Sequence, residues 1–119
     1  QKREEGMKFD AKKEKGFTVV SITGRMDAVT TPEAEGKLTG LIDAGERELV
    51  VDLQGLDYIS SAGLRGILAT AKRLKAEQGD IVFANLQGHV TEVFKISGFH
   101  SLFRIFDSVN AAVDGLRRA

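Results

Sequence analysis

A nearly continuous apolar run, ELVVDL at residues 48–53, most constrains how this chain can fold. A strand with one exposed face alternates apolar and polar residues, whereas a continuous apolar run indicates a strand covered on both faces. Strands of the second kind belong to α/β domains, in which helices pack on both sides of a largely parallel sheet. We therefore expect residues 48–53 to form the central strand of such a sheet.

Other strand patterns lie before and after this run. Residues 7–13 and 17–23 predict two short strands joined by EKG, and a glycine in so short a connection suits an antiparallel hairpin. DIVFAN at residues 80–85 predicts another buried strand, and LFRIF at residues 102–106 predicts the last one. We expect the sheet to open with an antiparallel pair and to continue mostly in parallel.

Amphipathic segments between and after the strands predict helices. The first helix begins at TTPE, where Thr30 or Thr31 is the expected N-cap and Pro32 suits the first turn. The second helix is expected over residues 61–78, with Gly79 as its C-cap.

Two further helices complete the pattern. One carries Val90 and Phe94 and ends before Gly98, and the other follows Ser108, a suitable N-cap. Strands joined by helices imply right-handed crossovers within one sheet. The predicted fold is α/β: a single domain over residues 1–119 with a mixed, mostly parallel central sheet, entered by an antiparallel strand pair and flanked by about four helices.

The composition excludes several classes of protein. The 17 basic residues balance the 17 acidic ones, so no overall field attracts nucleic acid or an anionic membrane. No apolar run approaches the roughly 18 residues of a membrane-spanning helix, and the absence of cysteine fits a reducing compartment, so we expect a cytoplasmic protein. The first six residues, QKREEG, lack the apolar segment of a secretory signal, and we expect them to be a tail.

Candidate catalytic groups are few. The chain has no G-x-x-x-x-G-K-[ST] phosphate loop, and ISSAGL does not match the G-x-S-x-G elbow of serine hydrolases. His89 and His100 are isolated, so an exposed or structural role is favoured over metal binding. We expect no enzymatic activity, no catalytic residue, no metal and no cofactor.

The segment YISSAGLRG at residues 58–66 is an unusual start for a helix, because each interior glycine costs about 1 kcal/mol relative to alanine. Ser61 is the expected N-cap, which would satisfy a free backbone N–H. A phosphate on Ser61 would be tolerated at a helix N-terminus. Its charge of about −1.5 to −2 would nevertheless oppose the binding of a closely packed partner.

The residues after Ser61 predict a contact surface. At 100° per residue, the large apolar side chains of this helix fall on one side, and Ala62, Gly66 and Ala69 fall nearly opposite. An outward strip of small residues favours close packing by a partner, although Gly63 and Gly66 could instead admit a neighbouring segment of the same chain. Arg65 opposes the helix dipole, so its charge is expected to serve a partner or an anion.

Three motifs, TGRMDAVT, VVDLQGLDYISSAGLRGIL and ISGF, occur in this order and resemble those of bacterial anti-sigma factor antagonists of the STAS domain family. The resemblance covers residues 9–116. It implies that the unphosphorylated protein binds an anti-sigma factor that is also a serine kinase of the histidine-kinase-like ATPase type. It further implies that phosphorylation by this kinase weakens the complex and that a metal-dependent serine phosphatase restores it.

The resemblance also implies which residues form the site. The family's acceptor serine matches Ser61, its preceding aspartate matches Ser60, and its following serine or threonine matches Ala62. Ser60 is a second, less favoured acceptor. Asp27 matches the acidic residue of the G-x-[LM]-D loop near the phosphorylation site, or is only a local turn residue. The predicted partner-binding residues are Asp27, Ser60, Ala62, Gly63, Arg65, Gly66 and Ala69.

Two other functions stay open. The first is a constitutive scaffold in a larger complex, in which the serine is only a helix cap. The second is a small-molecule sensor that uses the helix end around Ser61, Gly63 and Arg65. The SSAGLR variant also resembles family members whose final target is not a sigma factor.

Overall fold

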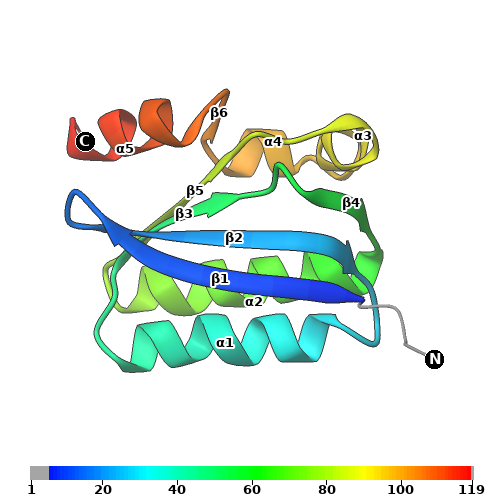
Figure 1. The fold of residues 1–119 in the computed structure, drawn as a ribbon, viewed down its shortest axis with the longest axis horizontal. Helices are drawn as coiled ribbons and strands as arrows, with labels where there is room; N and C mark the ends of the chain where they lie inside the picture. The colour runs from blue at the N-terminus through cyan, green and yellow to red at the C-terminus, as the bar shows by residue number, and fades with distance from the viewer. Residues whose placement is uncertain (1–5, 119) are drawn as a thin grey trace.

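The computed structural model describes residues 6–118, which form a six-stranded mixed sheet with helices on both faces (Figure 1). The strands are β1 (Met7–Glu14), β2 (Phe17–Met26), β3 (Glu48–Asp52), β4 (Leu56–Ile59), β5 (Asp80–Ala84) and β6 (Ile105–Phe106). The strand order is β1-β2-β3-β5-β6, and β4 also pairs with β2. Among the strands of residues 6–118, only β1 and β2 are antiparallel, which confirms the predicted opening hairpin and the mostly parallel sheet.

The helices lie on both sides of this sheet. They are α1 (Thr31–Asp43), α2 (Ser61–Ala76), α3 (Gly88–Ser97), α4 (Phe99–Leu102) and α5 (Val109–Arg117). In Figure 1, α1 and α2 lie side by side below the sheet and α5 lies on the opposite side. Thr30 and Ser108 occupy the N-cap positions of α1 and α5, and α3 ends before Gly98, as predicted.

Alternating side chains of the central strands fill two cores. Leu49 and Val51 of β3 face the larger core with Phe83 of β5, and α1, α2, α3 and α4 all contribute side chains to it. Val50 faces the smaller core, where α5 contributes Val113. The apolar run at residues 48–53 is therefore continuous because both of its faces are buried, as expected of the central strand.

The strand predicted at residues 102–106 is largely wrong. Residues 99–102 form the single turn α4, and only Ile105 and Phe106 pair with β5. A helical turn brings Phe99 and Phe103, four residues apart, edge to face with ring centroids at 5.4 Å. Phe83 lies against Phe103 in the same cluster, so burial of aromatic rings decides the local structure here.

A strand that the sequence pattern did not indicate positions the rest of the site. β3 pairs with the first half of β2, and β4 pairs with its second half, where Met26 lies opposite Ile59. A turn at residues 53–55 separates the two strands, and the Leu56 N–H donates to the Leu53 carbonyl oxygen at 3.0 Å. The polypeptide thus leaves β4 beside the end of β2 and enters α2 directly.

The C-terminal end of α2 differs from the prediction. The helix ends at Ala76, and Gln78 adopts the left-handed conformation, with φ of 66°, that was expected of Gly79. A side chain on Gly79 would collide with the Arg47 carbonyl oxygen and with Leu74. Glycine is needed there for close packing and not as the helix cap.

The small residues of α2 do not form an outward strip. The buried side of α2 comprises Gly63, Gly66, Ile67, Thr70 and Leu74, while Leu64 and Leu68 are only half-buried. A Cβ on Gly66 would lie 2.6 Å from Thr31 Cγ2, at the contact between α2 and α1. The helix is therefore rotated relative to the prediction, because Gly66 admits a neighbouring helix of the same chain.

The predicted N-terminal tail is described only in part. The Gly6 carbonyl oxygen accepts a hydrogen bond from the Arg25 N–H at 2.8 Å, so Gly6 extends the pairing of β1 with β2. The other five residues of the predicted tail lie outside the described residues. Among residues 6–118, no helix has the length and apolar character needed to cross a membrane.

The contact at Gly66 predicts a difference between two glycine substitutions. Gly36→Ala places a methyl group in open space on α1 and should raise the free energy of unfolding by up to about 1 kcal/mol. Gly66→Ala gains the same propensity but must displace Thr31, so it should be less stable than Gly36→Ala by about 1–3 kcal/mol. Thr31→Ser removes Cγ2, so a variant that combines Gly66→Ala with Thr31→Ser should recover much of this loss. Urea denaturation measures all three, and equal stability of the two single variants would contradict the packing.

Candidate functional site

The candidate site forms where β2 and β4 end side by side. The Ser60 N–H donates to the Met26 carbonyl oxygen at 2.9 Å, which continues the pairing of the two strands by one residue. The next residue after Met26 is Asp27, and the next after Ser60 is Ser61, the first residue of α2. Two predicted site residues, 34 positions apart in the sequence, are thereby brought to the same edge of the sheet.

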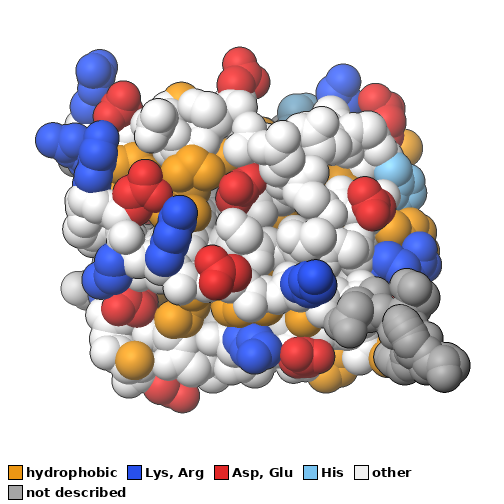
Figure 2. Space-filling model, viewed as in Figure 1, with side chains coloured by type: hydrophobic (Ala, Val, Ile, Leu, Met, Phe, Trp, Pro, Cys, Tyr) orange, Lys and Arg blue, Asp and Glu red, His pale blue; other side chains and the backbone are white. Residues whose placement is uncertain are grey.

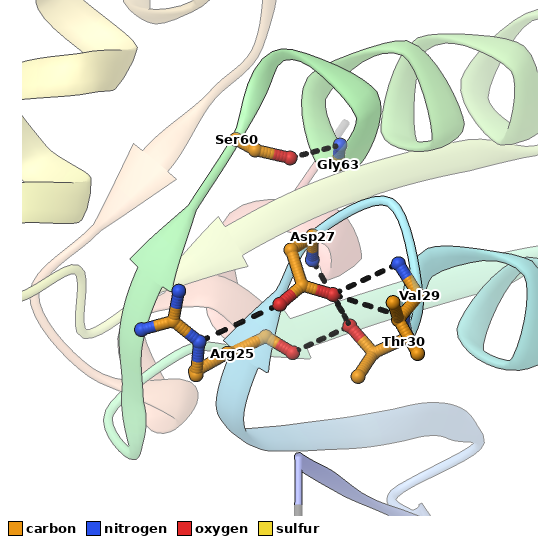
Figure 3. A network of polar contacts seen from close by, with 6 residues as sticks. All are labelled: Arg25, Asp27, Val29, Thr30, Ser60 and Gly63. Carbon is orange, nitrogen blue, oxygen red and sulfur yellow. Dashed lines mark hydrogen bonds and ion pairs between the residues drawn. The ribbon is translucent and has the colours of Figure 1, made fainter.

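The two adjacent serines have different environments. Ser60, not Ser61, is the N-cap of α2: its φ and ψ are −97° and 177°, and its Oγ accepts a hydrogen bond from the Gly63 N–H at 3.3 Å (Figure 3). The assignment of Ser61 as N-cap is therefore wrong by one residue. Ser61 lies in the first turn and is exposed, whereas Ser60 is half-buried.

A network of hydrogen bonds organises the loop between β2 and α1. Asp27 Oδ1 accepts hydrogen bonds from the N–H groups of Val29 and Thr30, each at 3.0 Å (Figure 3). In return, Thr30 Oγ1 accepts a hydrogen bond from the Asp27 N–H at 3.0 Å and donates to the Arg25 carbonyl oxygen at 2.7 Å. The Thr30 hydroxyl thus orders the loop instead of capping α1.

Asp27 is suited to carry a negative charge at this place. The Thr30 N–H, more than that of Val29, lowers the pKa of the Asp27 carboxyl from its ordinary value, and partial desolvation opposes the shift. The Arg25 Nε lies 3.5 Å from Asp27 Oδ2. Asp27 acts here as a turn residue, which was the simpler of its two predicted roles, and its carboxylate lies beside the start of α2.

The predicted partner-binding residues of α2 divide into two groups. Gly63 and Gly66 are buried, so they determine how α2 packs and present no side chain to a partner. Arg65 and Ala69 are exposed, as is the predicted phosphoacceptor Ser61, and Ala62 is half-buried. The exposed positions are spaced by four residues and therefore follow one face of α2.

A shallow groove of about 470 Å³ runs between α1 and α2 next to this face. Its walls include Ala28 from the loop before α1, Pro32 from the first turn of α1, and Ala62 and Ala69 from α2. Small side chains on both walls leave room for a side chain of another molecule. The groove, the Asp27 loop and the exposed face of α2 are called the α2 surface below.

Val29 is a feature of the α2 surface that the sequence pattern does not indicate. It is next to Ala28 in the loop, and 85% of its area is exposed although its side chain is apolar. Its backbone N–H donates to Asp27 Oδ1, so the side chain projects from a backbone that is held in place. A single valine in a polar turn has no periodicity, and only the structure identifies it as exposed.

An aromatic stack borders the same edge of the sheet. The Arg25 guanidinium lies 4.3 Å from the centre of the Tyr58 ring, and the His89 ring stacks on Tyr58 at 5.0 Å with an interplanar angle of 9°. His89 thus has a structural contact, in line with its predicted role. His100 lines a separate cleft of about 490 Å³ between α3, α4 and β6, which none of the predicted site residues reaches.

The 17 basic and 17 acidic residues of the chain balance, so its overall charge does not attract a charged partner. Figure 2 shows basic and acidic side chains interspersed over the face of the molecule that Figure 1 presents. Within residues 6–118, no three histidine or acidic side chains lie close enough together to hold a metal ion. Recognition at the α2 surface must therefore depend on local contacts.

Comparisons with known proteins define the class of protein to which this fold and site belong. The profile of the STAS domain matches residues 8–112, so the chain belongs to the STAS domain family. Within the family it is similar to a protein of Bordetella bronchiseptica that bears the name "Putative anti-sigma factor antagonist BtrV". The two are 42% identical over 113 residues, which are 95% of this chain and 97% of BtrV.

Solved structures agree with this assignment. The crystal structure of an anti-sigma factor antagonist from Mycobacterium paratuberculosis has a TM-score of 0.84 and 25% identity, over 93% of this chain and 94% of that one. The anti-sigma factor antagonist SpoIIAA shares the fold, with 19% identity in both of its forms. Its unphosphorylated form has a TM-score of 0.80 over 94% and 98% of the two chains. The phosphorylated form from Bacillus has a TM-score of 0.72 over 92% and 99%.

The capping geometry predicts that the two serines contribute differently to stability. Ser60→Ala removes the acceptor for the Gly63 N–H and should lower the free energy of unfolding by about 1 kcal/mol. Ser60→Asp should retain most of this stability, since aspartate is an equally good N-cap. Ser61→Ala should have a clearly smaller effect than Ser60→Ala. Chemical denaturation compares the three, and a larger loss for Ser61→Ala would overturn the cap assignment.

Proposed function

We propose that this protein is an anti-sigma factor antagonist that acts as a phosphorylation-controlled binding module. Its unphosphorylated form binds an anti-sigma factor that is also a serine kinase of the histidine-kinase-like ATPase type. Phosphorylation of Ser61 releases the kinase, and a metal-dependent serine phosphatase restores binding. The module acts in the cytoplasm and is not itself an enzyme.

The observation that carries the proposal is the exposure of Ser61 at the start of α2, beside a fixed loop. A kinase must reach the hydroxyl of its substrate, and the Ser61 side chain is accessible while Ser60 is half-buried and occupied as a cap. This favours Ser61 over Ser60 as the acceptor. Similarity to BtrV along nearly the whole chain supports the regulatory role.

The partner surface that we propose differs from the predicted set in its composition. Asp27, Ala62, Arg65 and Ala69 stay in it as residues whose side chains a partner can reach, and Ser61, predicted as the phosphoacceptor, is added to it. Gly63 and Gly66 act only by allowing α2 to pack closely. Ser60 acts as the cap that fixes the start of α2, next to the reactive hydroxyl.

Substitution of Ser61 tests the switch directly. Ser61→Asp should weaken binding of the cognate kinase, because it places a negative charge at the contact, and Ser61→Ala should bind without being released by ATP. The kinase is recovered by pull-down from the source cell, and its affinity for each variant is measured by isothermal titration. Mass spectrometry after incubation with ATP should locate the phosphate on Ser61.

Three outcomes would count against this proposal. Phosphate on Ser60 would move the acceptor by one residue. If the kinase bound Ser61→Asp as tightly as the parent protein, a negative charge at this position would not be what releases the kinase. Stable binding with no phosphate on either serine would favour the constitutive scaffold instead.

Val29 provides a second test that does not depend on phosphorylation. If the partner covers the loop, burial of this valine contributes about 1.5–3 kcal/mol, and Val29→Ser should weaken kinase binding about tenfold or more. Ile96 on α3 is equally exposed, at 85%, so Ile96→Ser is a matched control that should bind normally. Equal weakening by both substitutions, measured by titration, would argue against a contact at the loop.

A further inference from the structure

Arg65 is the basic side chain placed to meet a group on Ser61. It follows Ser61 by four residues in α2, and both residues are exposed. Side chains at this spacing lie on the same helix face with Cβ atoms about 5–6 Å apart. Helical side chains lean toward the N-terminus, so a side chain at position 65 is within reach of a group on Ser61.

Arg65 also has no ion-pair partner within the part of the chain that the structure describes. Arg73, two turns later, pairs with Asp43 at 2.6 Å, and Arg25, Arg47 and Arg104 each pair with a carboxylate. Arg65 lies in the N-terminal half of α2, where the helix dipole disfavours a cation. No ion pair within the described residues holds its guanidinium, although Glu35 of α1 lines the same groove.

The exposed face of α2 is basic along its length. The helix sequence SAGLRGILATAKRLKA contains no aspartate or glutamate, and Arg65, Lys72 and Lys75 are all exposed. A surface of this charge is complementary to carboxylates on a partner. Among these cations, Arg65 is the one within a single turn of Ser61.

We propose that Arg65 changes its binding partner when Ser61 is phosphorylated. In the unmodified protein, its guanidinium binds a carboxylate on the partner. In the modified protein, the phosphate on Ser61 holds the same guanidinium, so the partner loses a cation and meets an anion. This inference rests on the proposed function, because it requires that Ser61 is phosphorylated and that the unmodified form binds the kinase.

Arg65 has the chemistry to bind a partner carboxylate in the unmodified protein and the phosphate on Ser61 in the modified protein. In the kinase reaction the Ser61 Oγ–H bond is replaced by a bond from Oγ to the γ-phosphorus of ATP, with ADP as the leaving group and the proton released to solvent. The phosphate adds about −1.5 to −2 charge and three acceptor oxygens. A guanidinium can bind either a carboxylate or a phosphate through two parallel hydrogen bonds, and the nearer group takes it.

The intramolecular contact is measured on the protein alone. Phosphoserine is incorporated at position 61 by genetic encoding, and the second ionisation of the phosphate, with an ordinary pKa of about 6, is followed by ³¹P NMR. Arg65→Gln should raise this pKa by about 0.3 unit or more, since it removes a cation that favours the dianion. Lys72→Gln is the matched control, because it removes the same charge at about 16 Å from Ser61 along the helix axis, beyond the Debye length of about 8 Å. A shift for Arg65→Gln no larger than that for Lys72→Gln would overturn the contact.

The effect of Arg65 on kinase binding is measured with the kinase recovered by pull-down. The quantity compared is the ratio of the kinase's affinities for the unmodified and the phosphoserine forms. Arg65→Gln should weaken binding of the unmodified form about tenfold and should shrink the ratio, while Lys72→Gln leaves the ratio near that of the parent protein. If phosphoserine releases the kinase equally from the parent and from Arg65→Gln, the switch stands and the role of Arg65 is wrong. If the kinase neither modifies Ser61 nor discriminates between the two forms, the proposed function fails, and the NMR titration still decides whether Arg65 holds the phosphate.

Discussion

The candidate site depends on how closely the first turn of α2 approaches the edge of the sheet. A Cβ on Gly63 would lie 2.6 Å from Ile59 Cγ1 and 3.0 Å from the Met26 carbonyl oxygen, so only glycine allows this approach. The same carbonyl oxygen accepts a hydrogen bond from the Ser60 N–H. With these contacts in place, the cap, the exposed serine and the loop after β2 occupy fixed positions relative to one another.

Much of the fold can be predicted from the sequence, because apolar periodicity reports burial directly. The run at residues 48–53 identified the central strand, and Ser108 marked the start of α5. β4 was missed because its four residues, LDYI, include an exposed aspartate and have too little pattern. The failed strand at residues 102–106 shows that aromatic packing can override local strand propensity.

The site was predicted less completely, and the errors have a common cause. Counting residues around a helix gives relative directions but cannot say which neighbour covers each side. Gly66 therefore appeared to face a partner, whereas α1 packs on it. The cap position was wrong by one residue because Ser60 and Ser61 are equally good candidates from sequence, and only the path of β4 distinguishes them. Arg65 was identified because its charge opposes the helix dipole, which sequence alone reveals.

The reciprocal hydrogen bonds between Asp27 and Thr30 have a consequence for how binding is driven. A loop that is already ordered in the free protein gives up little conformational entropy when a partner binds, and so does a helix whose first turn is capped. Complex formation at this surface then resembles the docking of two rigid bodies, with little accompanying folding. When both surfaces are rigid, the electrostatic free energy of a change of charge at one residue appears almost in full in the free energy of binding. No rearrangement of the backbone reduces it.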